Sequence, residues 1–198
     1  MYNKKFNPMM LLVLISLLFT QQSFADQKAI ELDKKVDLAI KKFKTDVEGG
    51  AKFLSKVKGY LVIPSVIKAG FIIGGEYGTG ALRINGVTKH YYSLTSASVG
   101  YQIGAQEHSV LIAFLSEASL NNFMSSNGWE AGVDGSVAVA EWGKTGDISS
   151  ISYEKPIVAF IFDQKGLMAS ASIKGTKFQR ILPQQGSLPQ QRIKSNDD

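Results

Sequence analysis

No cysteine occurs in the 198-residue chain, which excludes disulfides, thiolate metal sites and a lipid-modified N-terminal cysteine. Histidine is nearly as scarce, because only His90 and His108 are present, and neither has a carboxylate partner at a recognisable spacing. The sequence also lacks an H-E-x-x-H element, a Walker loop and a complete G-x-G-x-x-G motif, so it carries no motif for zinc-protease or nucleotide-binding chemistry. We therefore expect no enzymatic activity, no cofactor and no metal.

No apolar run is long enough to cross a membrane. The longest apolar-rich segment extends over 11 residues, from Met9 to Phe19, whereas a membrane-spanning helix needs about 20. Lys4 and Lys5 precede it, and Ser23-Phe24-Ala25 supplies small residues at the two positions that a signal peptidase reads. We predict that residues 1–25 are a signal peptide cleaved after Ala25. The protein would then be exported to the periplasm or the extracellular space, soluble or peripherally attached to a membrane.

Acidic residues are missing from two stretches, residues 49–75 and 164–196. Dispersed and solvated lysines are one interpretation of this pattern. In the other, the fold brings the two stretches together, and they form a cationic surface suited to anionic lipid headgroups. The basic residues considered for that surface are Lys52, Lys56, Lys58, Lys68, Lys174, Lys177 and Arg180.

Apolar residues recur at helical spacing after the predicted signal peptide. They lie three or four positions apart and form one stripe of an amphipathic helix. The stripe comprises Leu32, Val36, Ile40, Phe43 and Val47. Gly49-Gly50 ends this helix, and Ala51, Leu54 and Val57 predict a shorter second helix that ends near Gly59. Lysines and acids are mixed on the polar face of the first helix, so we expect its stripe to pack on the domain rather than on a membrane.

Glycines interrupt the next segment, which otherwise has the pattern of a strand. They are Gly70, Gly74, Gly75, Gly78 and Gly80. Because a glycine inside a strand has no side chain to pack, this series predicts bulges, close backbone crossings or sharp corners. Asn85-Gly86, which follows, is a strong signal for a two-residue hairpin turn.

The remaining pattern predicts further strands and one more helix. We expect a strand at 110–115, a helix at 117–124 with Leu120 and Phe123 inward, an alternating strand at 129–142, and a last hairpin that pairs 157–162 with 167–173.

These elements predict an α+β fold, in which N-terminal amphipathic helices precede a strongly curved, mainly antiparallel sheet or barrel-like core. We assign residues 26–182 to this single domain. Residues 183–198 have too few apolar side chains to pack, so we expect a disordered polar tail.

Several ordered blocks resemble the SYLF domain, a family of lipid-binding modules. These blocks are Gly59 to Leu82, Tyr91 to Leu94, Ser98 to Gln106 and Lys165 to Ala171, and the likeness covers roughly residues 52–182. The resemblance implies a non-enzymatic protein that binds anionic phospholipids through basic residues and an N-terminal amphipathic segment. On this basis the seven basic residues named above are the predicted lipid-binding residues. The polar face of the first helix is charge-balanced, so the phosphoinositide preference of eukaryotic members is not carried over; phosphatidylglycerol or cardiolipin would be the anionic partner in a bacterial envelope.

Other functions stay open at this point. A small outer-membrane barrel fits the signal peptide, the alternation and the glycine content, although such barrels need strands of about 9–11 residues and several predicted strands are shorter. A structural or protein-binding module of the envelope is a further alternative. Ser65-Val66-Ile67-Lys68 matches the S-x-x-K element of penicillin-binding enzymes, but the later elements of that motif set, which begin at Ser125 and Lys144, are too close together for that family.

Overall fold

The computed structural model of the 198-residue chain describes residues 8–70, 73–99, 106–141, 155–165 and 173–182. The helices are α1 (Pro8–Asp46), α2 (Gly50–Leu54) and α3 (Glu117–Ser125). The strands are β1 (Gly59–Gly70), β2 (Ile73–Ile84), β3 (Val87–Val99), β4 (Gln106–Phe114), β5 (Trp129–Glu130), β6 (Val137–Glu141), β7 (Ile157–Lys165) and β8 (Lys177–Ile181).

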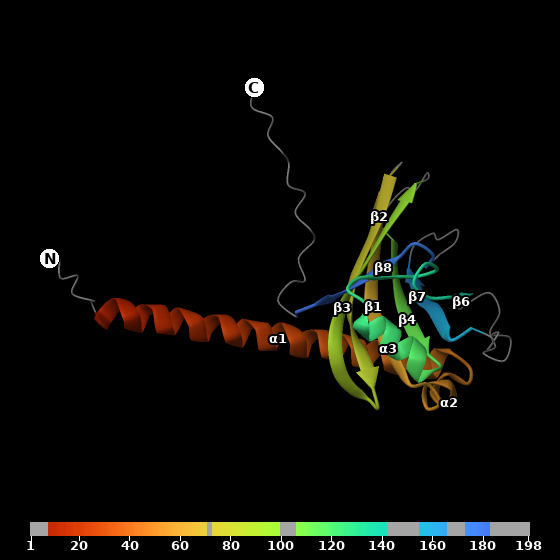
Figure 1. Cartoon of the computed structure of the whole chain (residues 1–198), viewed down its shortest axis with the longest axis horizontal. Coiled ribbons are helices and arrows are strands. Elements are labelled where there is room, and N and C mark those ends of the chain that lie inside the picture. Colours follow the sequence, from red (N-terminus) through yellow and green to blue (C-terminus); the bar gives the residue numbers. More distant parts are fainter. Residues whose placement is uncertain (1–7, 71–72, 100–105, 142–154, 166–172, 183–198) are drawn as a thin grey trace, which may run out of the picture.

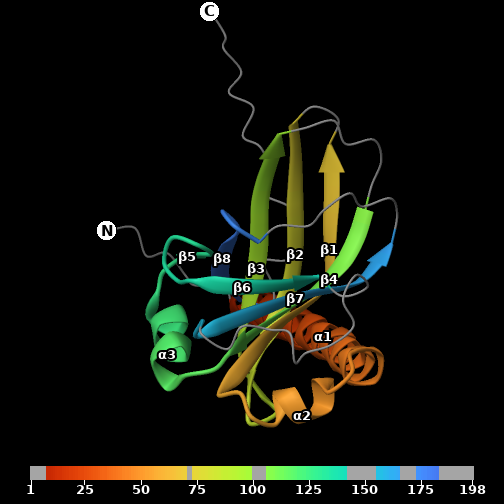
Figure 2. The ribbon, with the colours of Figure 1, turned by 90° about the vertical axis from the view of Figure 1, so that its right-hand side faces the viewer.

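The strands form one sheet in the order β5-β8-β3-β2-β1-β4-β7-β6. Among these named strands, β6 and β7 pair in parallel and the other neighbours pair antiparallel. Figures 1 and 2 show that the sheet curls into a half-barrel, with α1 across one face of the long strands and α3 on the other side. The predicted α+β class and the strongly curved, mainly antiparallel sheet are confirmed.

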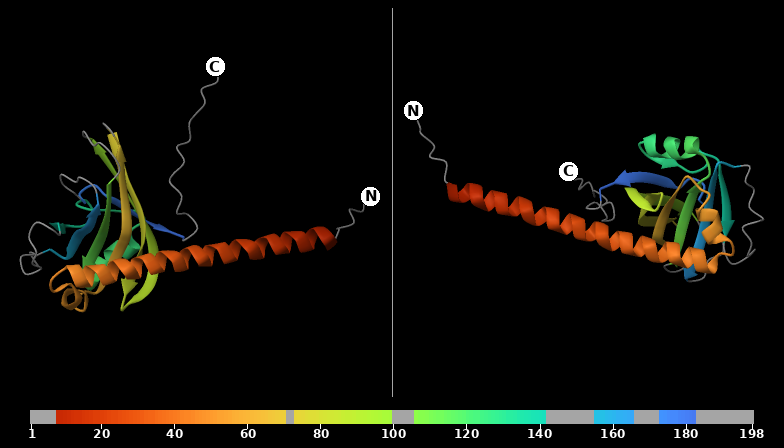
Figure 3. Two further views of the ribbon diagram at one scale, coloured as in Figure 1. Left: turned by 180° about the vertical axis from the view of Figure 1, so that it is seen from behind. Right: turned by 90° about the horizontal axis from the view of Figure 1, so that it is seen from below.

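Helix α1 packs its second half on the sheet. Val36, Phe43 and Val47 are fully or almost fully buried. The ring of Phe43 meets those of Phe160 and Phe162 on β7 edge to face, with centroids 4.9 and 5.4 Å apart. The predicted apolar stripe therefore belongs to the core. Removing these side chains from water stabilises the folded state. The first half of α1 projects away from the sheet (Figure 3).

A second apolar cluster fills the concave side of the sheet, under α3. Leu120 and Phe123 point inward from this helix as predicted, and Phe123 contacts the rings of Tyr92 and Trp129. Ser116 caps the helix, because its side chain accepts a hydrogen bond from the backbone N–H of Ser119. The helix and its cap close one side of the half-barrel.

The glycines of β2 allow β1 to approach unusually closely. A Cβ atom on Gly80 would overlap the carbonyl oxygen of Val62 and lie 2.8 Å from Cα of Ile63. The pairing of β1 with β2 shifts register between Val62 and Val66, around Pro64, and proline is tolerated in strands at such bulges. The predicted bulge and close crossing are thus present, and they bend the sheet.

The hairpin turn at Asn85-Gly86 also forms as predicted. Asn85 has φ 52° and Gly86 has φ 77°, the left-handed values that a two-residue turn of type I′ requires. The turn joins β2 to β3, whose pairing is the longest in the sheet.

Three local predictions are wrong. The second helix ends at Leu54 and buries Phe53 and Leu54, whereas Ala51 is exposed, because a helix of five residues has no room for the longer stripe. The strand predicted at 129–142 is broken after β5, because the carboxylate of Asp134 accepts a hydrogen bond from the Glu130 backbone N–H at 2.6 Å and closes a turn. The pairing predicted between 157–162 and 167–173 is also wrong, because β7 has β4 and β6 as its two neighbours in the sheet. Residues 167–172 and the tail at 183–198 lie outside the described residues.

Candidate functional site

A group of polar side chains fixes α1 to the sheet. Arg83 of β2, which is only 8% exposed, lies 2.7 Å from Oδ1 of Asp37 and 3.3 Å from Oδ1 of Asp33. Asp33 also accepts hydrogen bonds from the hydroxyls of Thr88, at 2.8 Å, and Tyr91, at 3.0 Å. Burial, followed by the hydrogen bond to Asp33, raises the pKa of Tyr91 to about 12. Two acids of α1 are therefore engaged by the sheet, and the helix is held in one register.

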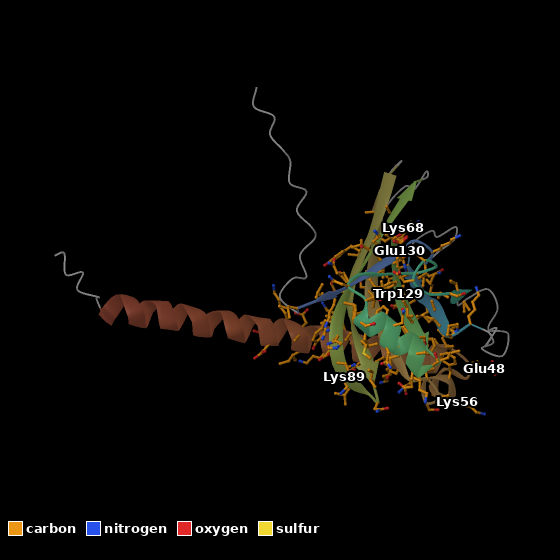
Figure 4. The ribbon with its side chains drawn as sticks, viewed as in Figure 1. Glu48, Lys56, Lys68, Lys89, Trp129 and Glu130 are labelled. Carbon is orange, nitrogen blue, oxygen red and sulfur yellow. The ribbon has the colours of Figure 1, made fainter. Side chains whose placement is uncertain are left out.

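The first basic stretch lies in part around α2. Lys52, Lys56 and Lys58 are exposed there, and Lys56 is at the end of the molecule where β2 turns into β3 (Figure 4). Nζ of Lys58 is 3.7 Å from Oε1 of Glu117 in a solvent-exposed pair, which has little energetic weight. Within the described part of the chain, Lys52 and Lys56 form no ion pair, so their charges are available to a partner.

Lys68, by contrast, forms an ion pair within the protein. It is opposite Glu76 in the β1–β2 ladder, with Nζ 3.1 Å from Oε1, and the two side chains are 12% and 9% exposed. His108 lies on the same face of the sheet and is 3% exposed, with no hydrogen-bond partner for Nδ1 among the described residues. Burial lowers the pKa of His108, while the charges of Glu76 and Lys68 have smaller, opposing effects. Lys68 is thus part of a largely buried polar layer and not one of the dispersed, solvated lysines.

The second basic stretch is on and beside β8. Nζ of Lys177 is 3.6 Å from Oε2 of Glu130, and Lys174 is exposed next to Gly132. Nη2 of Arg180 contacts both ring nitrogens of His90, at 2.8 Å for Nε2. In the sheet, β8 is separated from β1 by β3 and β2.

The seven predicted residues therefore occupy three places rather than one face. Figure 4 shows Lys56 and Lys68 toward opposite ends of the molecule. Two residues that the sequence reading missed extend the set around α2: Val87, which is 58% exposed, and Lys89, which is exposed at the same end of the molecule as Lys56. Their position directly after the Asn85-Gly86 turn was the available signal, because a hairpin tip projects into solvent.

We call this surface the hairpin–α2 end. It consists of Lys52, Lys56, Lys58, Val87 and Lys89. Its two parts are the α2 region and the β2–β3 hairpin. They lie at the same end because the start of β1 pairs with the end of β2: Tyr60 is opposite Arg83, and a Cβ on Gly59 would lie 3.2 Å from Ile84. Glu48 and Glu117 are the acids beside it. An exposed apolar tip flanked by lysines is suited to contact with an anionic interface.

The S-x-x-K element does not form a serine–lysine pair. Ser65 lies in a groove of about 340 Å³ between α1 and β4, where its hydroxyl donates to Oε1 of Glu107 at 2.7 Å. Lys68 is on the opposite face of β1, because it pairs with Glu76 in the layer that also holds His108. The described residues contain no group of three or more His, Asp or Glu side chains that could hold a metal ion. No helix in the described ranges is both long and apolar enough to span a membrane.

The family comparison matches part of the chain. Residues 95–181 match the model of the Ysc84 family, described as Las17-binding protein actin regulator, whereas no curated protein matches. The matched segment runs from the second half of β3 to the end of β8. It includes the sequence blocks Ser98 to Gln106 and Lys165 to Ala171, and the glycine-rich block precedes it. The match supports the resemblance stated from these blocks, over residues 95–181.

Proposed function

We propose that this protein is a non-enzymatic domain that binds anionic phospholipid surfaces, and that it does so with the hairpin–α2 end. The observation that carries the proposal is that exposed lysines of the α2 region and of the β2–β3 hairpin, which also carries the exposed Val87, lie at one end of the molecule (Figure 4). Its family assignment fits a non-catalytic role.

Electrostatics supports this choice of surface over the other predicted residues. Lys68 is neutralised by Glu76 and is largely buried, so it has no free charge to offer a headgroup. Lys177 has Glu130 nearby. Lys52 and Lys56 form no ion pair within the described residues, and each lysine close to an anionic surface contributes about 1 kcal/mol.

The expected binding is weak and sensitive to salt. Four lysines at about 1 kcal/mol each are partly offset by the neighbouring acids Glu48 and Glu117. The Debye length is about 8 Å at physiological ionic strength, so exposed charges act only at short range. Insertion of Val87 would add an apolar contribution that salt does not screen.

Vesicle flotation tests the proposal directly. The protein is floated with phosphatidylcholine vesicles and with vesicles that also contain phosphatidylglycerol, at low and high salt. We expect recovery only with the anionic vesicles and mostly at low salt. Removing two charges with Lys52→Gln and Lys56→Gln should weaken the binding by about 30-fold, which corresponds to about 2 kcal/mol.

A matched control removes the same charge elsewhere. The double variant Lys174→Gln, Lys177→Gln also loses two positive charges, but on the other predicted surface. If the control loses as much binding as the α2 variant, only net charge matters and the hairpin–α2 end is not the contact. Equal recovery with neutral and anionic vesicles would remove the electrostatic proposal altogether.

The cellular location is part of the same proposal. We propose that the chain is exported and that residues 1–25 are removed, leaving a single domain at 26–182. The geometry is compatible with this, because the buried residues of α1 start at Val36 and the preceding half of the helix projects from the sheet (Figure 3). Mass spectrometry of the protein from the producing cell tests it, since a mature N-terminus at Asp26 is expected.

A further inference from the structure

Three basic side chains meet at the pairing of β3 with β8. Arg180 lies directly across from Tyr92 in the ladder, and its guanidinium reaches back over His90, two residues earlier on β3. Lys89 is the immediate neighbour of His90 and is exposed. Within the described ranges Arg180 makes no ion pair with a carboxylate, which is unusual for a guanidinium held against a second basic group.

The charged side chains described next to His90 are both positive, namely Arg180 and Lys89. Burial lowers the pKa of His90, and the charges of Arg180 and Lys89 lower it further. Opposite His90, β2 presents Leu82, which carries no charge. The acids of α1 are on the other face of the sheet, because Asp33 and Asp37 engage Arg83 there. His90 is therefore neutral at pH 7 and accepts a hydrogen bond from Arg180.

We infer that His90 and Arg180 form a proton-linked binding site for a phosphate group. This inference deepens the proposed function, on which it rests for the lipid as a source of the phosphate. A planar guanidinium binds two phosphate oxygens at once, and a protonated imidazole beside it can donate a further hydrogen bond to one of the same oxygens. Protonation of His90 next to Arg180 is unfavourable in the empty site, and a bound anion offsets that repulsion.

Linkage sets the sign of the pH dependence. Because the anion favours the charged imidazole, binding raises the pKa of His90, and the affinity must increase as the pH falls through that range. A phosphodiester is the suitable probe, because its own charge does not change in this range. The ligand that the site would recognise is thus a phosphodiester headgroup or a free phosphate, which share the same chemistry.

The two histidines make the measurement simple. Proton NMR titration of the full chain resolves His90 and His108, and a His108→Gln variant assigns them. We expect dimethyl phosphate, but not chloride at equal ionic strength, to raise the pKa of His90 and leave that of His108 unchanged. In Arg180→Gln the starting pKa of His90 should be higher and the response to dimethyl phosphate should be lost.

Two results would overturn the inference: a His90 titration that is the same in dimethyl phosphate and chloride, or a response that survives in Arg180→Gln. Anionic vesicles then identify the source of the phosphate. A greater loss of vesicle binding in Arg180→Gln than in Lys177→Gln, which removes the same charge, assigns the site to a lipid headgroup. Equal losses, together with a dimethyl phosphate response, assign it to a soluble phosphate and leave the site itself intact. If the protein does not bind vesicles at all, the proposed function fails while the His90 titration still decides the site.

Discussion

The close crossing of β1 and β2 makes a strong prediction about Gly80. Replacing it with alanine adds one methyl group at a place that is already filled by backbone. That methyl would overlap the Val62 carbonyl oxygen and lie 2.7 Å from the carbonyl carbon of the same residue. Neither atom belongs to a flexible side chain, so the strain cannot be relieved by a rotamer change. Strand β1 itself would have to move.

The magnitude follows from the packing. Overpacking a core typically costs about 1–3 kcal/mol, and we expect the upper end because β1 is fixed on both sides by β2 and β4. A loss of about 3 kcal/mol is a large part of the usual 5–15 kcal/mol of unfolding free energy. For a chain of this size it lowers Tm by about 6–12 °C.

Urea unfolding followed by far-UV circular dichroism measures the effect. Gly75→Ala is the matched control on the same strand, because its nearest neighbour would be the Ser96 carbonyl oxygen at 3.6 Å, an ordinary contact. We expect the control to change the free energy of unfolding by less than about 0.5 kcal/mol. If Gly80→Ala unfolds at the same urea concentration as the control, the close crossing does not exist in solution and the reasoning is refuted.

Three further predictions test the polar groups of the fold. Arg83→Met should loosen α1, so that hydrogen exchange of its second half speeds up while that of β4 does not; unchanged exchange would show that Arg83 does not hold α1 on the sheet. Lys68→Met should cost about 3 kcal/mol by leaving Glu76 buried and unpaired, and adding Glu76→Leu should recover most of it; a harmless single change would contradict the buried pair. Burial lowers the pKa of His108 below its ordinary value of 6.5. As the pH falls, His108 is therefore protonated in the unfolded chain before it is protonated in the folded one. The free energy of unfolding should therefore fall as pH drops below 6.5, and this fall should be smaller in His108→Gln.

Patterns that depend on neighbours in the sequence predicted the fold well. The stripe of α1, the Asn85-Gly86 turn and helix α3 each need only a few adjacent residues to be recognised. Strand order could not be predicted in the same way. The pairing of β8 with β3 joins residues about 90 positions apart, and nothing in either segment alone specifies its partner. For the same reason, the contact of Arg180 with His90 was not predicted.

Lys68 illustrates how one local irregularity changes a site prediction. Simple alternation from Leu61 and Ile63, which are buried, would put Ile67 inside and Lys68 outside. The register shift between Ile63 and Val66 reverses the alternation, so Lys68 is buried and Ile67 is 54% exposed. A series of glycines predicts that a bulge occurs but not where it occurs, and a displacement of one residue exchanges the two faces.

Charge balance along the sequence is likewise a poor guide to the charge that a partner meets. Helix α1 has mixed lysines and acids, and for that reason it was not expected to be a cationic surface. In the fold, Arg83 engages Asp33 and Asp37, and Glu31 pairs with Lys35 four residues on. Each such pair removes one acid and one base from the charges that a partner would meet. Lysines are paired in the same way, since Lys42 of α1 contacts Asp163 of β7. The electrostatic surface of this protein therefore depends on which charged groups the fold pairs, and the sequence count alone does not give it.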